Sequence, residues 1–553
     1  MIKIRKNYIP AVVLLSLLLF FLYFFNIWSY DLWSPDEPRY AEVARETAVE
    51  GNWVIPHLNN RVYYEKPPVF YNIIAVAGLM AGEFSVTVVR LPVIIISVLL
   101  IAFFTNFIIQ KTNFYIGILS GIILATTGQF FWLAMRINLD IPLVFCTTIS
   151  ALIFFHHIDS FYSYKWSTLI AFFLIGLGAI IKSPISILPL LVALIYAFTE
   201  KKTKKLKEIP WFFAFVVMLI PAAVWLYFAY REAGFTYIQT SVLDQLVGYS
   251  TGSQGHPQPF YYYLLNFPVL ALPWSIFLIP AFYYYNKLKT KVPNLVKFSM
   301  LWFIIVFIIF SFVGSKRGVY LLQIYPASAI IIAWFFKSHF DGTIREKYSL
   351  VIPILFLAIL FITVGGYIYL NGEVLIKEEL NFSLSENLGY YSLYQGLYIF
   401  FISIGLLFIL STLTKNKKYL FYSIMTFSLV LIILLKSLFL PALNEVKSER
   451  FLAEDLARFY NKNVEVGLWG SLNNDSGFVF YNGIYYDYIF DNYKRGKKFL
   501  ERPGQQILIV NEAAKLFNNL SENEYRDFNI KKYRVGSDDM LLLIERKLME
   551  GLN

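Results

Sequence analysis

Residues 34–40 read Ser-Pro-Asp-Glu-Pro-Arg-Tyr and follow directly on the first long apolar run of the chain. The adjacent carboxylates Asp36 and Glu37 therefore lie at the mouth of a predicted membrane helix. Charged groups in such a place are costly unless they stay hydrated and serve a function. A second charged cluster, residues 63–68 with the sequence Tyr-Tyr-Glu-Lys-Pro-Pro, follows before the next long apolar run. The first loop is therefore the leading candidate for a functional site.

The composition is that of a multi-pass membrane protein. Of 553 residues, 58% are hydrophobic and only 15% are charged, whereas soluble domains carry about 25% charged residues. The net charge of +11 would suggest a nucleic-acid partner in a soluble protein. Here the Lys and Arg residues concentrate in short loops, which favours membrane topology as the explanation and no nucleic-acid partner. The first apolar run has no small-residue cleavage site, and we interpret it as a retained span.

Apolar runs long enough to cross a hydrocarbon core of about 30 Å recur along the chain. We identify about 13 such runs, at residues 9–29, 88–110, 114–134, 139–158, 166–181, 184–199, 210–230, 262–285, 296–314, 318–336, 349–370, 396–414 and 419–440. A further run, 68–82, would reach only roughly 22 Å as a helix. We interpret it as a juxtamembrane or re-entrant helix.

The basic loops set the orientation through the positive-inside rule. If the N-terminus is cytoplasmic and 68–82 does not cross, every strongly basic short loop falls on the cytoplasmic side. These loops are 200–207, 287–291, 345–347 and 415–418. Counting 68–82 as a span would place all of them outside. The first loop and the C-terminal region are therefore predicted on the non-cytoplasmic face.

The chain divides into two predicted domains. Residues 1–440 form a transmembrane domain with juxtamembrane helices at about 35–50 and 68–82. Residues 441–553 read as a small α/β domain without a Gly-rich phosphate loop or a metal-ligand cluster, for which a structural or docking role is the simplest interpretation. Its predicted helices are 445–460 and 492–500, and its predicted strands are 464–469, 478–481, 506–510 and 540–544.

Three acids on the predicted outer face are candidate catalytic residues. Ser34, Pro35 and Glu37 fit a helix capping box, with Ser34 at the N-cap. Compensation of the helix dipole explains Glu37 but not Asp36, because the box requires no acid there. Asp140 opens a later span, where balancing the dipole is the alternative. We predict Asp36, Glu37 and Asp140 as the catalytic set, with Asp36 accepting a proton from an acceptor or orienting it.

Several cations on the predicted outer face run against the positive-inside preference and call for an anionic partner. A phosphate or pyrophosphate site is one explanation, and lipid headgroup contact is the other. The predicted phosphate-binding residues are Lys66, Lys182, Lys316, Arg317 and Tyr320. His256 with Glu65 would supply part of a divalent metal site, although a loop histidine is more often solvated.

At these residues the chain resembles the GT-C superfamily of membrane glycosyltransferases, to which protein O-mannosyltransferases also belong. Within it, the chain is most similar to the bacterial aminoarabinose transferase family that modifies lipid A. The resemblance rests on the acidic pair and two juxtamembrane helices of the first outer loop, and on a second acid in the next outer loop. The matching stretches are 35–42, 51–57, 64–68, 176–182, 256–262 and 315–321.

The resemblance implies an α-helical polytopic membrane protein of GT-C type, with about 13 transmembrane helices and a small C-terminal periplasmic α/β domain. It implies undecaprenyl phosphate carrying 4-amino-4-deoxy-L-arabinose as donor and a lipid A phosphate, or another membrane glycan, as acceptor in the bacterial inner membrane. By family analogy Asp36 is the key acid, Lys66 binds the carrier phosphate, and Glu65 with His256 holds a metal ion. No nucleotide cofactor is expected, because the donor already carries a phosphate leaving group.

Two other classes stay open from the sequence. The turn at 315–320 lacks the Leu-Pro that the family commonly has before the tyrosine, which leaves room for another polyprenyl-phosphate sugar and a protein or glycan hydroxyl as acceptor. A lipid or glycan transporter would place charged or broken helices at the bilayer midplane and show related halves. Here the charges gather at one face, and no inverted repeat is apparent.

Overall fold

The computed structural model describes residues 8–162, 164–244, 257–288, 292–380, 388–414, 416–461, 463–469, 477–490, 493–502, 505–511, 528–535 and 538–545. The chain forms two compact units. The first unit comprises Met1–Phe25, Glu65–Pro67 and Val93–Leu435, and the second comprises Asn26–Tyr64, Pro68–Pro92 and Lys436–Asn553. The second unit therefore combines the first loop with the C-terminal region, two segments far apart in the sequence.

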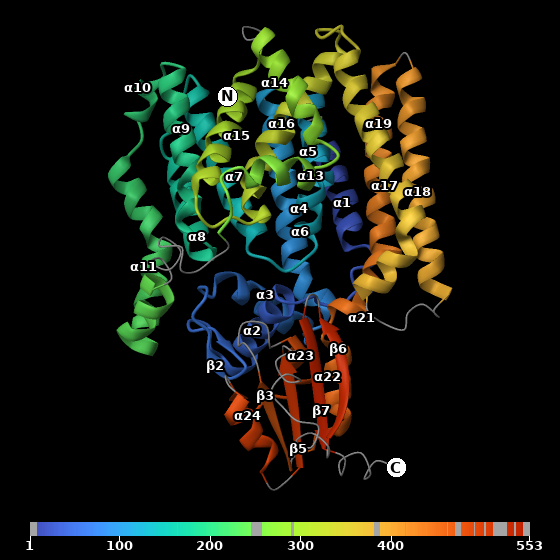
Figure 1. The fold of residues 1–553 in the computed structure, drawn as a ribbon. Helices are drawn as coiled ribbons and strands as arrows, with labels where there is room; N and C mark the ends of the chain where they lie inside the picture. Colours follow the sequence, from blue (N-terminus) through green and yellow to red (C-terminus); the bar gives the residue numbers. More distant parts are fainter. Residues whose placement is uncertain are drawn as a thin grey trace. The chain divides into compact units, whose positions relative to one another are not determined.

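The first unit is a bundle of apolar helices, among which α17, α18 and α19 pack side by side (Figure 1). Short 3-10 or π segments interrupt it at η2 (Pro184–Ile187), η3 (Gln239–Asp244), η4 (Ser275–Phe277) and η6 (Gly318–Ile324). The helix α4 begins in the second unit and continues into the first. The helices are α1 (Ile9–Phe24), α4 (Val86–Lys111), α5 (Phe114–Thr126), α6 (Gly128–Ala134), α7 (Asp140–Asp159), α8 (Ser167–Ile181), α9 (Leu188–Thr199), α10 (Thr203–Leu206), α11 (Trp211–Ile238), α13 (Tyr262–Leu270), α14 (Leu278–Lys287), α15 (Asn294–Phe312), α16 (Tyr325–Phe340), α17 (Tyr348–Leu380), α18 (Leu388–Leu413) and α19 (Lys417–Leu434).

The helices confirm a multi-pass membrane protein. Within the described residues, eight helices are long and apolar enough to cross a membrane, or ten if the bent pairs α5–α6 and α13–α14 each form one span. The helices α1, α8 and α9 are apolar but shorter. Every predicted apolar run has a helix or helix pair at its position, while the total of about 13 spans stays a prediction.

The best-packed spans carry two of the candidate site residues. In α7, 78% of the most apolar 18-residue window is buried, and in the span formed by η6 and α16 this share is 89%, against 17% for α11 and the segment that follows it. The helix α8 is fixed by a close approach to α11. A Cβ atom at Gly176 would lie 1.9 Å from the backbone oxygen of Met218, so only glycine fits there. The spans that carry Asp140 and Tyr320 are therefore well buried, and α8 lies close against α11.

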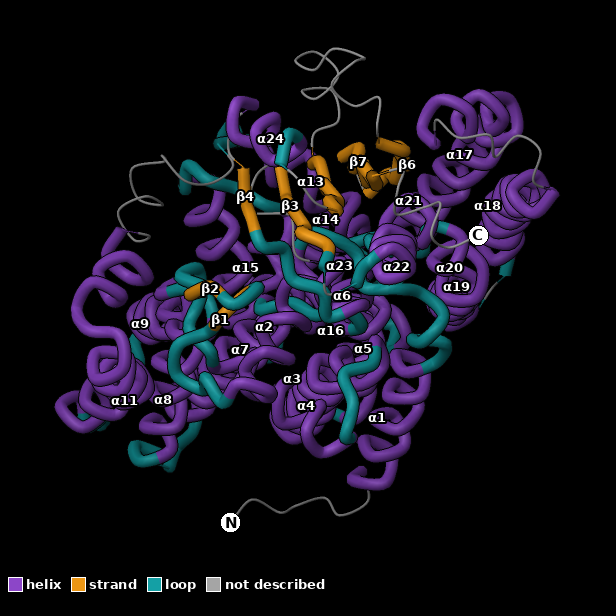
Figure 2. The backbone as a smooth tube through the Cα atoms, turned by 90° about the horizontal axis from the view of Figure 1, so that it is seen from below, coloured by secondary structure: helices purple, strands orange, loops and turns teal. Residues whose placement is uncertain are grey.

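In the second unit, the first loop forms two helices and a hairpin. These are α2 (Asp36–Glu50), β1 (His57–Leu58), β2 (Arg61–Val62) and α3 (Val69–Ala81). The turn residues Asn59 and Asn60 both have positive φ, as a tight two-residue hairpin requires. The hairpin lies beside α2 (Figure 2). Tyr40 of α2 packs against Tyr71 of α3, with 5.4 Å between the ring centroids. Both helices lie where the sequence predicts them.

The C-terminal region carries a five-stranded sheet in the order β4-β3-β5-β7-β6. The strand β3 pairs parallel with β4 and β5, whereas β7 pairs antiparallel with β5 and β6. The strands are β3 (Val464–Trp469), β4 (Tyr488–Phe490), β5 (Gln505–Asn511), β6 (Phe528–Val535) and β7 (Asp538–Glu545). The segments before and between them are η8 (Leu435–Phe439), α20 (Leu440–Ala442), α21 (Asn444–Lys447), α22 (Arg450–Phe459), α23 (Gly477–Asn482) and α24 (Tyr493–Leu500).

Alternating side chains of the sheet form two cores. Leu468, Ile509 and Leu542 are neighbours across the register and pack with α22 and α23 on one face. Trp469 and Val510 point to the other face, where α24 covers them. The predicted α/β character is thus confirmed.

Two details of the predicted C-terminal region are wrong or incomplete. Residues 478–481 were predicted as a strand but form part of α23, because a four-residue apolar run does not distinguish a strand from a buried helix. The predicted helix 445–460 is split into α21 and α22 at Ser448. The strands β4 and β6 lack a long apolar run and were not predicted.

The helix α2 buries two carboxylates one turn apart. Glu42 is fully buried and bonds Arg45 through both oxygens, at 2.8 and 2.6 Å. Glu46 is 1% exposed, and its weak bonds come from the backbone N–H of Asn60 at 3.3 and 3.4 Å. Burial, followed by the neighbouring Glu42 carboxylate, raises the pKa of Glu46 to about 8. A protonated Glu46 therefore suits the folded state.

This raised pKa predicts a pH-dependent stability. The contribution of Glu46 is full below its ordinary pKa of 4.5 and is lost as the pH rises through about 8. Glu46→Gln keeps the neutral form at every pH, so we expect it to melt a few degrees above the parent at pH 9 and close to it at pH 5. Melting in detergent measures this, with Glu83→Gln, an exposed glutamate beyond α3, as control. Parallel pH profiles for parent and Glu46→Gln would contradict the prediction.

Candidate active site

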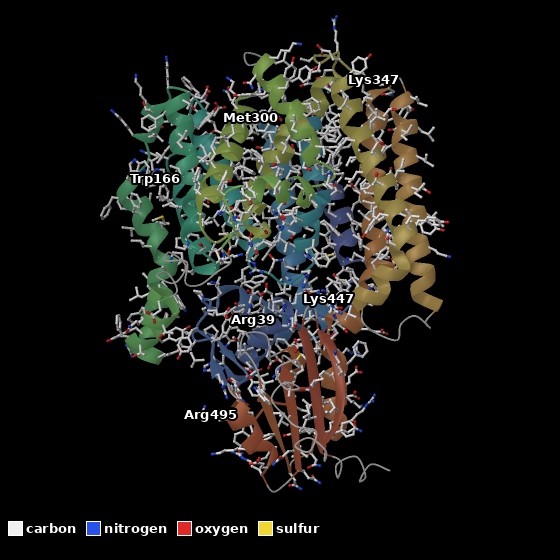
Figure 3. The ribbon with its side chains drawn as sticks, viewed as in Figure 1. Arg39, Trp166, Met300, Lys347, Lys447 and Arg495 are labelled. Atoms are coloured by element: carbon white, nitrogen blue, oxygen red, sulfur yellow. The ribbon has the colours of Figure 1, made fainter. Side chains whose placement is uncertain are left out.

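Asp36 is the first residue of α2, and 33% of its side chain is exposed. Its Oδ1 accepts a hydrogen bond from Arg39 Nη2 at 2.7 Å. Arg39 lies one turn further along the helix (Figure 3), and its guanidinium lies 5.4 Å from the ring centroid of Tyr40. Residues three apart face each other on a helix. The first loop thus presents a carboxylate that a neighbouring cation orients.

Glu37 has the opposite environment, because only 1% of it is exposed. Its Oε1 accepts from Arg90 Nε at 2.9 Å, and its Oε2 accepts from Arg90 Nη2 at 3.0 Å and from the backbone N–H of Trp33 at 3.2 Å. Arg90 comes from the first turns of α4 and is itself fully buried. Such bidentate pairing of a guanidinium with a carboxylate fixes the relative orientation of the two groups and neutralises the charge of each.

The remaining donors of Arg90 bind the chain just before Asp36. Nη1 donates to the carbonyls of Ile27 at 3.2 Å and Tyr30 at 2.9 Å, and Nη2 donates to the carbonyl of Asp31 at 2.6 Å. With the two bonds to Glu37, all five N–H donors of the guanidinium are used. We call Arg90, Glu37 and these three carbonyls the Arg90 clamp. It ties both flanks of Asp36 to α4, so the geometry favours a positioning role for Glu37.

The predicted capping box is wrong. The helix α2 begins at Asp36, and its N-cap Pro35 makes no side-chain cap. The hydroxyl of Ser34 donates to Glu449 instead, and Glu37 pairs with Arg90. The local pattern is correct for a capping box, but partners from distant parts of the sequence take both side chains.

Asp140 is the first residue of α7, and the side chain of Asn138, not that of Asp140, caps this helix. Asn138 Oδ1 accepts the backbone N–H groups of Asp140 at 3.0 Å and Ile141 at 2.9 Å. The Asn138 amide in turn donates to the carbonyls of Leu133 and Arg136, at 2.7 and 2.6 Å. Since Asn138 caps the helix, the Asp140 carboxylate is available for another partner.

That partner is Lys182 at the C-terminal end of α8. Its Nζ donates to Asp140 Oδ1 at 2.5 Å, and it lies 5.5 Å from the ring centroid of Tyr320 in η6. Three residues predicted from three separate turns therefore lie together in the first unit. An anion bound at Lys182 would share the ammonium with Asp140 and would have the phenol of Tyr320 nearby.

Lys316 and Arg317 have different environments. Lys316 is only 4% exposed, and its Nζ donates to the backbone carbonyl of Gln258 at 2.8 Å. Pro257 and Ser315 form a β-bridge at the same place, so Lys316 fastens two turns to each other. Arg317 is exposed, and of this pair it is the one that presents its charge at the surface.

Glu65 and Lys66 lie just before α3, and both are half-buried. His256 lies outside the described residues. Among the described part of the chain, no group of three His, Cys, Asp or Glu side chains is placed to hold a metal ion. The described residues thus contribute only Glu65 to the predicted metal site and do not by themselves fit one.

Three residues of this site escaped the sequence prediction. Arg39 stands three residues after Asp36, a spacing that signals a helical ion pair. Arg90 is a cation inside the apolar run 88–110, which is a signal for a buried, paired group. Asn138 is a preferred N-cap residue just before a helix. The sequence does not predict which groups Arg90 and Asn138 bind.

Comparison with known proteins finds similarity to membrane glycosyltransferases. Residues 65–228 match the family model described as dolichyl-phosphate-mannose-protein mannosyltransferase. A protein of Shewanella sediminis is 26% identical over 395 residues, which are 68% of each chain. A protein of Proteus mirabilis is 28% identical over 351 residues, 60% of each chain. Both are named undecaprenyl phosphate-alpha-4-amino-4-deoxy-L-arabinose arabinosyl transferase. The matches thus span 60 to 68% of the length of these relatives.

The fold agrees over nearly the whole chain. The crystal structure of ArnT from Cupriavidus metallidurans in the apo state matches with a TM-score of 0.75 at 16% identity, covering 98% of this chain and 99% of that one. The same protein bound to undecaprenyl phosphate gives a TM-score of 0.73. The chain is therefore similar in sequence to aminoarabinose transferases and shares the fold of ArnT. This confirms the family resemblance, the helical GT-C fold class and the glycosyltransferase activity predicted from the sequence, while the roles of single residues in this GT-C protein stay predictions.

The Arg90 clamp predicts a large stability effect in this GT-C protein. Arg90→Met leaves the buried Glu37 carboxylate without its counter-ion, which costs about 3–5 kcal/mol. We therefore expect a clearly lower melting temperature in detergent, and partial recovery in the double variant Arg90→Met/Glu37→Gln, which buries no charge.

The matched control is Arg345→Met, since Arg345 is exposed and its loss should change stability by less than about 0.5 kcal/mol. If Arg90→Met melts no earlier than Arg345→Met, the clamp does not carry the stability assigned to it.

Proposed function

We propose that this chain transfers 4-amino-4-deoxy-L-arabinose from undecaprenyl phosphate to a phosphate of lipid A. The observation that carries this proposal is the match, over 60 to 68% of each chain, to relatives named for that sugar and carrier. The Cupriavidus neighbour, solved with undecaprenyl phosphate, supports the choice of carrier. The acceptor rests on the family alone.

The reaction is proposed to occur on the periplasmic face of the bacterial inner membrane. A topology of about 13 spans with a cytoplasmic N-terminus places the strongly basic short loops inside, in agreement with the positive-inside rule. It places the first loop, the starts of α7 and η6, the end of α8 and the C-terminal domain outside. The candidate acids and cations then share the face where the acceptor would be found.

The donor phosphate is proposed to bind the cations of this face. Transfer breaks the bond between the sugar C1 and the phosphate oxygen, and the negative charge that develops on the leaving phosphate needs neutralising. Lys66, Lys182 and Arg317 are the proposed clamp, and Tyr320 lies beside Lys182. Lys316 would act indirectly, because its ammonium holds the turn at Gln258.

Asp36 is the proposed catalytic carboxylate. A phosphate acceptor is already nucleophilic, so Asp36 would orient it or stabilise positive charge on the donor sugar, including its amine. Arg39 holds the carboxylate from one side at 2.7 Å. Asp140 is proposed to act through its pair with Lys182, by setting where that ammonium points.

Metal binding by Glu65 and His256 stays a separate proposal. A divalent ion there would neutralise phosphate charge. Because the described residues do not complete such a site, we derive no step through it. Measuring bound metal in the purified protein, with His256→Ala as the comparison, tests this proposal without an activity assay.

A second acceptor class is favoured by one observation, the match of residues 65–228 to protein mannosyltransferases. A hydroxyl acceptor must lose a proton, so Asp36 would then serve as general base. With a phosphate acceptor no such proton transfer is needed, so the two acceptor classes require different chemistry from the same carboxylate.

The test is mass spectrometry of lipid A from a Gram-negative strain that lacks its own transferase but makes the aminoarabinose donor. Expression of the parent chain should add one aminopentose. Asp36→Asn should reduce the rate by roughly 10²–10⁴-fold, because its amide cannot carry the charge. Glu50→Gln on the same helix should behave as the parent.

Asp36→Asn with parental activity would remove Asp36 from the mechanism. A well-expressed parent that adds no mass would overturn the proposed sugar and acceptor, and would direct the search to other polyprenyl-phosphate sugars.

A further inference from the structure

The four residues before Pro35 are held by side chains from the C-terminal region. Asn444 Oδ1 accepts the backbone N–H of Asp31 at 2.9 Å and the indole N–H of Trp33 at 3.2 Å. The hydroxyl of Tyr481 accepts the backbone N–H of Leu32 at 2.8 Å. These contacts lie within one compact unit, although more than 400 residues separate the partners along the chain.

Glu449 stands at the centre of this attachment. It is 1% exposed, it receives the hydroxyl of Ser34, and its Oε2 accepts the backbone N–H of Phe478 at 2.9 Å. The space around the carboxylate is closely fitted, since a Cβ at Gly477 would lie 2.7 Å from it. Beside it, Trp33 and Ser448 form an antiparallel bridge. A buried carboxylate with two donors is therefore built into the joint between the two segments.

We infer that Glu449 is a positioning residue for Asp36 in the proposed transfer reaction. Through Ser34 it fixes the chain two residues before Asp36, at a side chain that the Arg90 clamp does not bind. This inference rests on the role of Asp36 given under the proposed function. It assigns the C-terminal region a part in catalysis, through the loop that it holds, beyond that of an attached domain.

The physical reason is that the two clamps act on different bonds of one short segment. The Arg90 clamp holds the carbonyls of residues 27, 30 and 31 and the side chain of Glu37. The C-terminal region holds the N–H groups of Asp31 and Leu32 and the side chains of Trp33 and Ser34. Glu449 bonds the hydroxyl of Ser34 and the N–H of Phe478, so it acts on Asp36 through the backbone that it holds.

This arrangement predicts a loss in kcat with little change in KM. The proposed phosphate-binding residues Lys66, Lys182 and Arg317 belong to the first unit, so substrate binding does not depend on Glu449. A misplacement of a catalytic group by about 1 Å can cost around 10²-fold in rate. We expect Glu449→Gln to lower kcat by roughly 10–100-fold with the donor KM unchanged.

The experiment uses the full chain and two variants of the bond. In Glu449→Gln the charge is lost, and the new NH2 group faces either the N–H of Phe478, which loses its acceptor, or Ser34, whose hydroxyl must turn to accept. Ser34→Ala removes the same bond from the other side with a minimal change in shape. If the two side chains act as one unit, the double variant should lose no more activity than the more damaged single variant. Glu465→Gln is the matched control, since Glu465 lies on β3 and pairs with Arg502 at the surface.

Hydrogen exchange provides a readout independent of activity. Amides of residues 31–36 should exchange faster in Glu449→Gln and Ser34→Ala than in the parent, while the melting temperature and the exchange of the β3–β5 core stay close to the parental values. Glu465→Gln should leave exchange at 31–36 and kcat unchanged.

Three results would overturn the inference: an unchanged kcat, unchanged exchange at 31–36, or a fall in kcat that merely follows a general loss of stability. If the parent transfers no aminoarabinose, the proposed function fails, and exchange at 31–36 still decides whether Glu449 holds the loop.

Discussion

The buried guanidinium of Arg90 is the constraint on which the first loop depends. A fully buried charge is tolerated only when its hydrogen bonds and its counter-charge are complete. Arg90 meets this condition with Glu37 and three backbone carbonyls. Those partners surround Asp36 in the sequence, so satisfying one arginine also shapes the segment that carries the candidate catalytic carboxylate. Glu37 thereby has a structural role, whereas the carboxylate of the neighbouring Asp36 is partly exposed and pairs with Arg39.

The same logic of complete pairing recurs elsewhere in the site. Asn138 takes over the capping of α7, which leaves Asp140 to pair with Lys182. Glu449 takes the hydroxyl of Ser34 and an N–H of α23. Lys316 binds a carbonyl and holds a turn. These polar side chains bind backbone groups near the proposed catalytic and phosphate-binding residues and hold the backbone in place. Such preorganisation lets a carboxylate and an ammonium act without reorienting during the reaction.

Much of this could be predicted from the sequence where the signal is local. Long apolar runs predicted the membrane helices, and the short run 68–82 predicted α3 at its observed position. The acidic pair and the 63–68 cluster led to the family. What failed depends on distant partners. The capping box at Ser34 was displaced by Glu449, and the run 478–481 forms part of a helix in which the N–H of Phe478 donates to the same carboxylate. Pairing across 400 residues, as between Leu32 and Tyr481, leaves no trace in spacing or periodicity.

The central claim is that the phosphate of a lipid-phosphate sugar binds the lysines of the first unit, where Lys182 pairs with Asp140. An experimental structure of this chain with undecaprenyl phosphate bound tests it most directly. The account predicts the phosphate in contact with Lys66 and Lys182. A phosphate bound away from both lysines would contradict it.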